Sequence, residues 1–106
     1  MKYIEINGEK TYISFWGYKN YNSQIIRATD LNGNTHELNY NDLKEEKTSD
    51  EMLNDEKMAN YMNSLLRCGD IEQAHCIADE ILCEILERYG YKKTVEAFDG
   101  LDKWYA

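Results

Sequence analysis

The sequence predicts one α+β domain, in which a four-stranded antiparallel β-meander in residues 1–43 precedes a three-helix layer in residues 48–106. Short runs of alternating apolar side chains fill the first part of the chain. Two Asn-Gly pairs, which favour tight hairpin turns, separate some of these runs. From about residue 50 onward, apolar residues recur at helical spacing instead. The length of 106 residues and the hydrophobic content of 42% suffice for one core and not for two.

The N-terminal part contains β-branched and aromatic runs that are joined by polar turns. Asn7-Gly8 and the segment Asp30 to Asn34 are the clearest turn signals. A meander of this kind exposes an apolar face, so the sheet must either curl into a small barrel or be covered by helices. We expect helices to cover it. The strands are predicted at residues 2–6, 11–18, 24–29 and 35–40.

A polar segment, residues 41–47, is predicted to join the sheet to the helical part within one domain. Thr48 and Glu51 form a capping-box pattern and a loose apolar stripe follows, which predicts a first helix at residues 50–67. Apolar residues after Gly90 recur at spacings of four and three, which predicts a third helix at residues 91–106. Gly100 weakens that helix locally.

The central helix, residues 70–89, is the element around which we expect the chain to be organised. Asp70 suits its N-cap, Gln73 occupies the capping-box position, and Gly90 follows its last periodic residue. Placing residues at 100° steps separates an apolar face from an acidic one. The apolar face contains Ile71, Ala74, Ala78, Ile81, Leu82, Ile85 and Tyr89, and the acidic face contains Glu72, Glu80, Glu84 and Glu87.

The charge of the chain restricts the classes of partner. The net charge of −8 disfavours direct nucleic-acid binding, which depends on Lys and Arg, and favours a basic protein partner. The acidity lies in residues 44–106, which hold 15 acidic and 8 basic side chains. No apolar run is long enough to span a membrane and no secretory signal precedes the first strand, so we expect a cytoplasmic protein.

Three cysteines, Cys68, Cys76 and Cys83, form no C-x-x-C pair, and this spacing favours reduced thiols over disulfides or a zinc site. Neighbouring His75 projects about 100° away from Cys76 on a helix. We therefore expect neither a metal nor another cofactor.

Two motifs mark the C-terminal third: His75 to Leu86 reads H-C-I-A-D-E-I-L-C-E-I-L, and Val95 to Ala106 reads V-E-A-F-D-G-L-D-K-W-Y-A. Together with Gly90-Tyr91 between them, these motifs resemble the tails of many small uncharacterised proteins encoded by phages and prophages of Gram-positive bacteria. The resemblance implies a setting and not an activity, because small acidic phage proteins often act by occupying a host protein. Inhibitors of bacterial defence systems, such as anti-CRISPR proteins, are similar in size and charge.

His75 and Asp79 lie one turn apart on the predicted central helix, so the carboxylate could orient the imidazole. Such a pair can act as a general base, and a small enzyme or ligand-binding protein is the alternative function. No partner nucleophile or phosphate-binding loop accompanies the pair, and a half-buried histidine commonly has a carboxylate partner for structural reasons. We therefore predict no enzymatic activity and no catalytic residue.

Aromatic residues are dense in the predicted sheet, and Trp16, Tyr18 and Tyr21 cluster around one loop. Stacking on nucleic-acid bases would need accompanying basic residues, which this half of the chain lacks. Tyr and Trp are also enriched at protein interfaces. We therefore assign these three residues to a protein contact, although edge packing would also explain several aromatics.

The acidic residues Asp79, Glu80, Glu84 and Glu87 form the second candidate surface, and they would imitate a row of phosphates for a basic partner. The alternative is an ordinary solvated helix face. We therefore expect a small, acidic, non-enzymatic protein of a phage or mobile element that binds a basic host protein. An inhibitor of a host defence nuclease that mimics nucleic acid would fit this description. A structural, self-associating protein is a further alternative, because the sequence does not determine the oligomeric state.

Overall fold

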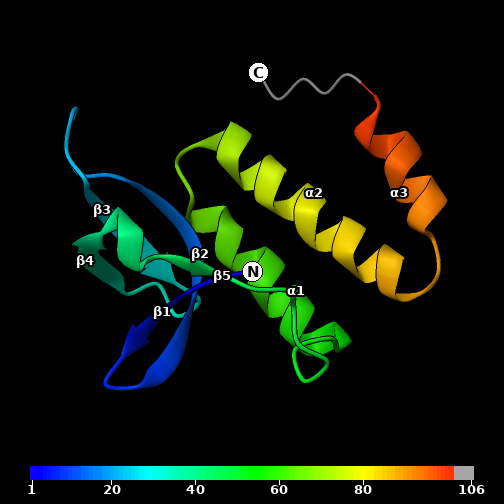
Figure 1. Cartoon of the computed structure of the whole chain (residues 1–106), viewed down its shortest axis with the longest axis horizontal. Coiled ribbons are helices and arrows are strands. Elements are labelled where there is room, and N and C mark those ends of the chain that lie inside the picture. The colour runs from blue at the N-terminus through cyan, green and yellow to red at the C-terminus, as the bar shows by residue number, and fades with distance from the viewer. Residues whose placement is uncertain (102–106) are drawn as a thin grey trace. The chain divides into compact units, whose positions relative to one another are not determined.

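The computed structural model describes residues 1–101, and these form an α+β fold with one five-stranded antiparallel sheet and three α-helices (Figure 1). The chain divides into two compact units, Met1–Arg67 and Cys68–Ala106. The unit boundary follows Arg67, so the first helix belongs to the same unit as the sheet. The expectation that residues 1–106 form a single domain stays a prediction.

The sheet has one strand more than the four predicted. Its order is β4-β3-β2-β1-β5, and each neighbouring pair is antiparallel. The fifth strand pairs Lys44 with Tyr3 and Glu45 with Lys2. The prediction missed it because two charged residues carry neither alternation nor β-branching. The strands are β1 (Lys2–Ile6), β2 (Glu9–Tyr18), β3 (Ile25–Asp30), β4 (Thr35–Asn39) and β5 (Lys44–Glu45).

Both predicted Asn-Gly turns connect adjacent strands. Asn7 and Gly8 adopt φ values of 53° and 82°, as a two-residue hairpin of the type I′ kind requires. Gly33 has a φ of 90° in the turn between β3 and β4. A side chain at either glycine would be strained in this left-handed region, so these positions explain why the hairpins form where the sequence indicates.

Strand β2 is shared between two halves of the sheet. Its first residues pair with β1, its last residues pair with β3, and the register shifts between Ile13 and Phe15. A bulge at such a position lets a strand bend from one half-sheet into the next. The apolar core inside the bend contains Ile4, Ile13, Ile26 and Ala28, with Trp16, Leu38 and Leu43 packed against it.

The sheet curls around this core. Residues of β1 and β4, including Ile4, Ile6 and Leu38, line the same pocket of about 380 Å³, although two strands separate β1 from β4 in the hydrogen-bonding order. Curling therefore provides much of the burial that we expected helices alone to provide.

A carboxylate outside the predicted strands anchors the segment that follows β5. The Glu46 side chain accepts hydrogen bonds from Lys10 Nζ at 2.6 Å and from the Tyr12 hydroxyl at 3.1 Å, and the Glu46 N–H donates to the Met1 carbonyl. The hydrogen bond from the Lys10 ammonium, with a smaller contribution from Tyr12, outweighs the effect of burial and holds the pKa of Glu46 below its usual value. These contacts hold the short fifth strand against β1.

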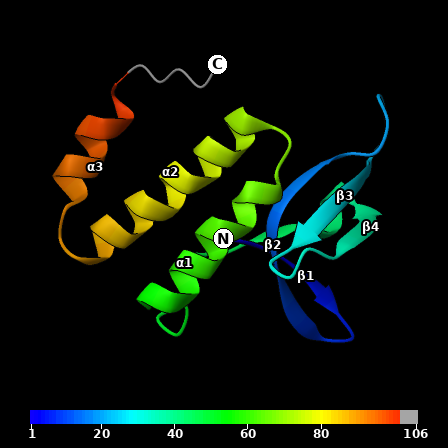
Figure 2. The same cartoon turned by 180° about the vertical axis from the view of Figure 1, so that it is seen from behind.

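Helix α1 (Asp55–Ser64) begins five residues after the predicted start. Its N-cap is Asn54, whose side chain accepts the Lys57 N–H at 2.9 Å, whereas the predicted cap residue Thr48 is buried. The 3₁₀-helix η2 (Leu65–Arg67) continues it to the end of the unit. Because Tyr61 donates a hydrogen bond to the Ile13 carbonyl and Ser64 contacts Ser14, α1 packs against β2. Figures 1 and 2 show this helix beside the sheet from opposite sides.

The second unit contains α2 (Ile71–Arg88) and α3 (Lys92–Asp99). The predicted caps of α2 are confirmed, because the Asp70 side chain accepts the Gln73 N–H and Gly90 adopts a φ of 91°. The predicted apolar face is only partly buried: Ile81 is 5% exposed, whereas Leu82 is 50% and Tyr89 is 73% exposed. The predicted end of the third helix, with Trp104 and Tyr105, lies outside the described residues.

Candidate interaction surface

Three aromatic side chains pack together at the end of β2. Trp16 contacts Tyr18 edge-on, with ring centroids 5.4 Å apart, and Tyr40 at 5.3 Å. Tyr18 and Tyr40 are stacked at 6.1 Å with 29° between their ring planes. Trp16 is half-buried, whereas 57% of Tyr18 and 40% of Tyr40 are exposed. A partly buried indole therefore supports two tyrosine rings that face solvent.

Tyr40 is a member of this cluster that the sequence reasoning did not select. It begins the 3₁₀-helix η1 (Tyr40–Asp42), which directly follows β4. The Asn39 side chain caps this helix by accepting the Asn41 N–H at 2.9 Å. Tyr18 ends β2, and the two residues lie 22 positions apart in the sequence. The sheet register, which places Tyr18 opposite Ile26 and Ile26 opposite Leu38, brings the two strand ends together.

Backbone hydrogen bonds fix the loop between β2 and β3 beside these rings. The Lys19 N–H donates to the Ile25 carbonyl at 2.9 Å, and the Tyr40 N–H donates to the Gln24 carbonyl at 2.8 Å. Asn22 adopts a φ of 66°, which an asparagine tolerates in a tight turn. The loop is therefore tied both to β3 and to η1.

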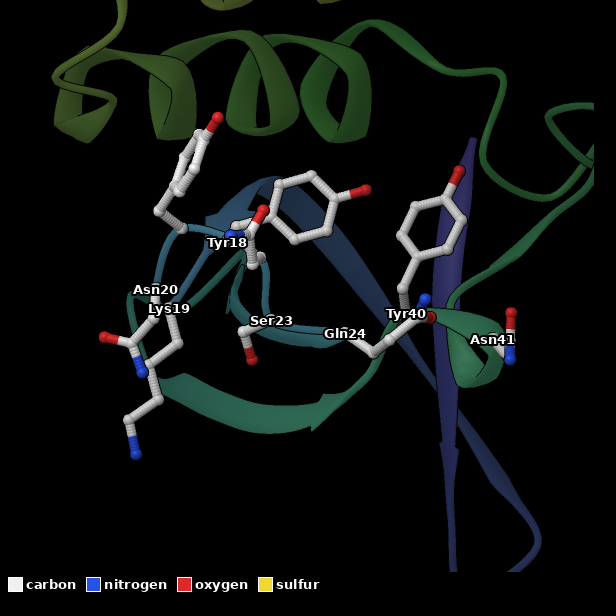
Figure 3. A pocket seen from close by; sticks show the side chains of 9 residues that line it. Tyr18, Lys19, Asn20, Ser23, Gln24, Tyr40 and Asn41 are labelled. Atoms are coloured by element: carbon white, nitrogen blue, oxygen red, sulfur yellow. The ribbon is translucent and has the colours of Figure 1, made fainter.

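The loop and the aromatic cluster form the walls of an open groove, which we call the tyrosine groove. It is lined by residues 18–24 together with Tyr40 and Asn41, and its volume is about 890 Å³. Figure 3 shows the Tyr18 and Tyr40 rings projecting from the same side, with the loop residues Ser23 and Gln24 beneath them. Tyr21 also lines the groove and is 95% exposed. The structure thus brings the predicted residues Trp16, Tyr18 and Tyr21 to one site.

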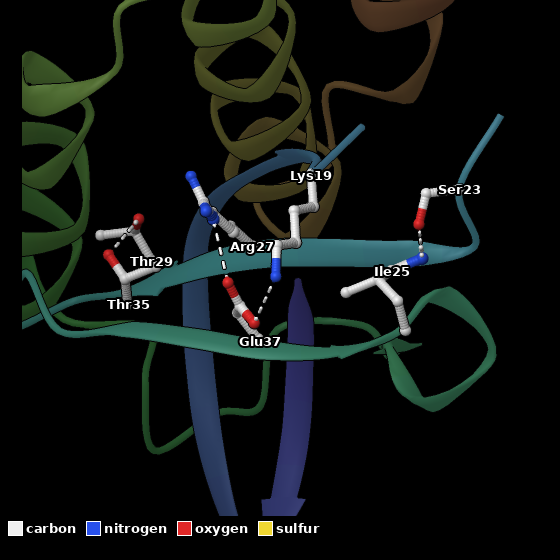
Figure 4. Close-up of polar contacts among 7 residues, drawn as sticks. All are labelled: Lys19, Ser23, Ile25, Arg27, Thr29, Thr35 and Glu37. Atoms are coloured by element: carbon white, nitrogen blue, oxygen red, sulfur yellow. Dashed lines mark hydrogen bonds and ion pairs between the residues drawn. The ribbon is translucent and has the colours of Figure 1, made fainter. Parts of the chain in front are cut away.

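The charged lining residue Lys19 has an acidic partner. Glu37 accepts hydrogen bonds from Lys19 Nζ and from Arg27 Nε, both at 3.2 Å (Figure 4). Arg27 and then Lys19 hold the pKa of Glu37 below its usual value. The groove thus presents aromatic, amide and hydroxyl groups, with its ammonium group already paired.

The predicted acidic surface lies in the other unit, on α2. Glu80 and Glu87 are exposed, whereas Asp79 and Glu84 are half-buried and engaged in interactions within the protein. Glu80, Glu84 and Glu87 follow one another at helical spacing, so their Cβ atoms lie along one stripe of the helix. This stripe stays a candidate site for a basic partner.

The alternative site pairs exposed His75 with half-buried Asp79 on the next turn of α2. Both residues take part in interactions within the protein. Cys68, Cys76 and Cys83 form no disulfide bond in the part of the chain that the structure describes. Within residues 1–101, no group of three or more His, Cys, Asp or Glu side chains is placed to hold a metal ion.

A second carboxylate–imidazole pair occurs in the β3–β4 hairpin, where the sequence analysis did not place one. Asp30 Oδ2 lies 2.8 Å from His36 Nε2, and Asp30 Oδ1 accepts the N–H groups of Asn32 and Asn34. Burial alone would raise the pKa of Asp30, but the hydrogen bonds from His36 and two backbone N–H groups outweigh it and lower that pKa. Both carboxylate oxygens of Asp30 thus contact groups within the same hairpin, which indicates a structural role.

No protein-family model, no curated protein and no solved structure matches this chain. Across residues 1–101, the helices are too short or too polar to cross a membrane.

Proposed function

We propose that this protein is a non-enzymatic interaction module that binds another protein through the tyrosine groove. The observation that carries the proposal is the packed aromatic cluster, in which half-buried Trp16 supports the exposed rings of Tyr18 and Tyr40. Aromatic side chains that are held rigidly lose little entropy on binding and are enriched among the residues that dominate interface energies. Aromatic rings that stay exposed at a loop contribute little to the stability of the fold, so binding a partner explains them better.

We propose that the protein is encoded by a phage or mobile element. It would act in the cytoplasm of the bacterial host. This part rests on the resemblance of residues 75–106 to small phage proteins. The partner is a basic host protein, of which a nucleic-acid-binding defence effector is one example. The net charge of −8 supports a basic partner, because opposite charges speed association. Inhibition of that effector would follow from occupation of its nucleic-acid-binding surface.

The test is capture of partners from a Gram-positive host lysate with the full chain and with the double variant Tyr18→Ala/Tyr40→Ala. We expect the double variant to lose the partner, because each truncated ring removes apolar contact area and an aromatic hot spot is worth about 2 kcal/mol or more. The matched control is Tyr89→Ala/Tyr91→Ala, which removes two tyrosines that are 73% and 55% exposed in the other unit. Retention of the partner by the groove variant and its loss in the control would contradict the proposal.

A variant at the alternative site separates binding from catalysis. His75→Ala should leave capture of the partner unchanged, because His75 does not line the tyrosine groove. Light scattering of the purified chain at several concentrations distinguishes a self-associating protein from one that binds a different partner. A large, concentration-dependent oligomer that Tyr18→Ala/Tyr40→Ala abolishes would assign the groove to self-association instead.

A further inference from the structure

We propose that the occupant of the tyrosine groove is an extended, proline-containing peptide segment in the polyproline II conformation, with a basic residue at the end nearest η1. This inference rests on the proposed function and names the chemistry of the partner. Its basis is a pair of exposed tyrosine rings, a polar lining whose charged residue Lys19 is paired, and the exposed carboxylate of Asp42, which follows the lining residue Asn41 in the sequence.

The aromatic geometry suits pyrrolidine rings. Tyr18 and Tyr40 lie 6.1 Å apart with an interplanar angle of 29°, so two exposed ring surfaces have nearly the same orientation. Trp16 contacts both rings and restrains them before any ligand arrives. A polyproline II segment is extended and rigid, and it docks into aromatic-lined grooves at a low entropic cost. A rigid row of rings therefore matches a rigid, apolar peptide.

The polar lining suits an uncharged backbone. A polyproline II segment has no internal hydrogen bonds, so its carbonyl groups need donors from the binding surface. Asn20, Gln24 and Asn41 are among the lining residues and carry side-chain amides, and the tyrosines carry hydroxyl groups. The Lys19 ammonium, the one charged group of the lining, is held by Glu37, a carboxylate that Arg27 shares, so the lining offers no cation without an acidic partner.

The charge next to the groove favours a basic flank. Asp42 directly follows the lining residue Asn41, is exposed, and has no ion-pair partner among residues 1–101. An Arg or Lys at the corresponding end of the peptide would pair with this carboxylate. The net charge of −8 acts in the same direction over longer distances.

The test measures binding of fluorescein-labelled peptides to the full chain by fluorescence anisotropy. The probe is a peptide of about ten residues in which prolines alternate with apolar residues and one end carries Arg, long enough to span roughly 30 Å. Two matched peptides replace every proline by glycine, or the Arg by Glu. We expect the glycine peptide to bind at least about tenfold more weakly and the Glu peptide about threefold more weakly, with the latter difference vanishing at high salt.

Protein variants locate the contact. Tyr18→Ala/Tyr40→Ala should weaken binding of the proline peptide about tenfold, whereas Tyr89→Ala/Tyr91→Ala should leave it unchanged. Asp42→Asn should remove the preference for Arg over Glu and keep the preference for proline over glycine. If the alanine variant misfolds by circular dichroism, Tyr18→Phe/Tyr40→Phe keeps the rings and should retain the preference for proline with weaker absolute binding.

Equal affinities for the proline and glycine peptides, or binding of neither, would overturn the inference. The capture experiment then shows whether the proposed function fails as well. If the partner still depends on Tyr18 and Tyr40, the groove binds a different protein surface and the proposed function stands. If capture is also independent of both tyrosines, the inference and the proposed function fail together.

Discussion

Single residues decide the shape of the hairpin between β3 and β4. Asp30 is 5% exposed, and its two carboxylate oxygens contact the N–H groups of Asn32 and Asn34 and the imidazole of His36. The sequence predicted the turn, because Asp, Asn and Gly at these positions favour it. It did not reveal the role of His36, which depends on the strand register: His36 lies opposite Ala28, and is therefore a diagonal neighbour of Asp30 on the same face.

Replacing Asp30 by Asn should lower the free energy of unfolding at pH 7 by about 1–3 kcal/mol, because hydrogen bonds to a charged acceptor are lost in a buried position. Urea denaturation followed by tryptophan fluorescence measures this loss. The matched control Asp42→Asn changes an exposed carboxylate three residues beyond β4 and should stay within about 0.5 kcal/mol of the wild type. A smaller loss for Asp30→Asn than for the control would contradict this account of the turn.

The pH dependence of that difference follows from the lowered pKa of Asp30. A carboxyl group whose folded pKa lies below its unfolded value of about 3.8 stabilises the fold above that pH. The stabilisation disappears as the pH falls through the folded pKa. The difference between wild type and Asp30→Asn should therefore be present at neutral pH and shrink below about pH 4. A difference that grows toward low pH would exclude Asp30 as its source.

At the scale of elements, a buried hydroxyl pair connects α1 to β2. The Ser14 and Ser64 oxygens lie 2.6 Å apart, and both residues are 3% exposed or less. Ser64 also donates to the Tyr61 carbonyl, one turn earlier in the same helix. Because a hydroxyl has a single proton, Ser14 must donate to Ser64 while Ser64 donates to Tyr61.

This direction of donation predicts that the two single variants lose unequal amounts of unfolding free energy. Ser64→Ala leaves the buried Ser14 hydroxyl without an acceptor and should cost about 1–3 kcal/mol of unfolding free energy. Ser14→Ala leaves Ser64 still donating to Tyr61, so it should cost less. The double variant should cost less than the two single costs added together, because the pair is coupled. Chemical denaturation of the three variants measures all these values, and a larger cost for Ser14→Ala would reverse the inferred donation.

The sequence predicted elements well where their signals are local. Asn7-Gly8 and the caps Asp70 and Gly90 act on their immediate neighbours, and their elements appear where expected. The start of α1 was wrong because two capping signals compete: Thr48 is buried, and Asn54 caps the helix instead. Strand β5 depends on pairing with β1, a contact between residues about 40 positions apart, and no local pattern encodes it.

At the scale of the whole molecule, the predicted site residues fall into two separate units. Trp16, Tyr18 and Tyr21 belong to unit Met1–Arg67, where the fold adds Tyr40 to them. Tyr40 was not predicted because its place in the cluster depends on the register in which β2, β3 and β4 pair. The acidic residues of α2 belong to the unit Cys68–Ala106, which carries nine acidic and four basic side chains, a net charge of −5. Under the proposed function, the aromatic groove would hold the partner and the acidic helix would attract it.

The triple variant Glu80→Gln/Glu84→Gln/Glu87→Gln tests the attraction. Gln keeps the size and helix propensity of Glu, so α2 should survive while three charges are lost. We expect the association rate with the captured partner to fall several-fold at low salt, and the dissociation rate to change little, because exposed charges steer encounter over a Debye length of about 8 Å at physiological ionic strength. Surface plasmon resonance at several salt concentrations separates the two rates.

The matched control Glu9→Gln/Glu51→Gln/Glu56→Gln removes the same charge from exposed positions of the other unit. If the position of the acidic helix matters, this control should slow association less than the α2 variant does. Equal slowing by both variants would mean that net charge alone attracts the partner. No slowing by either would leave the stripe of α2 as ordinary solvated surface, and binding would then depend on apolar contact at Tyr18 and Tyr40, which salt affects little.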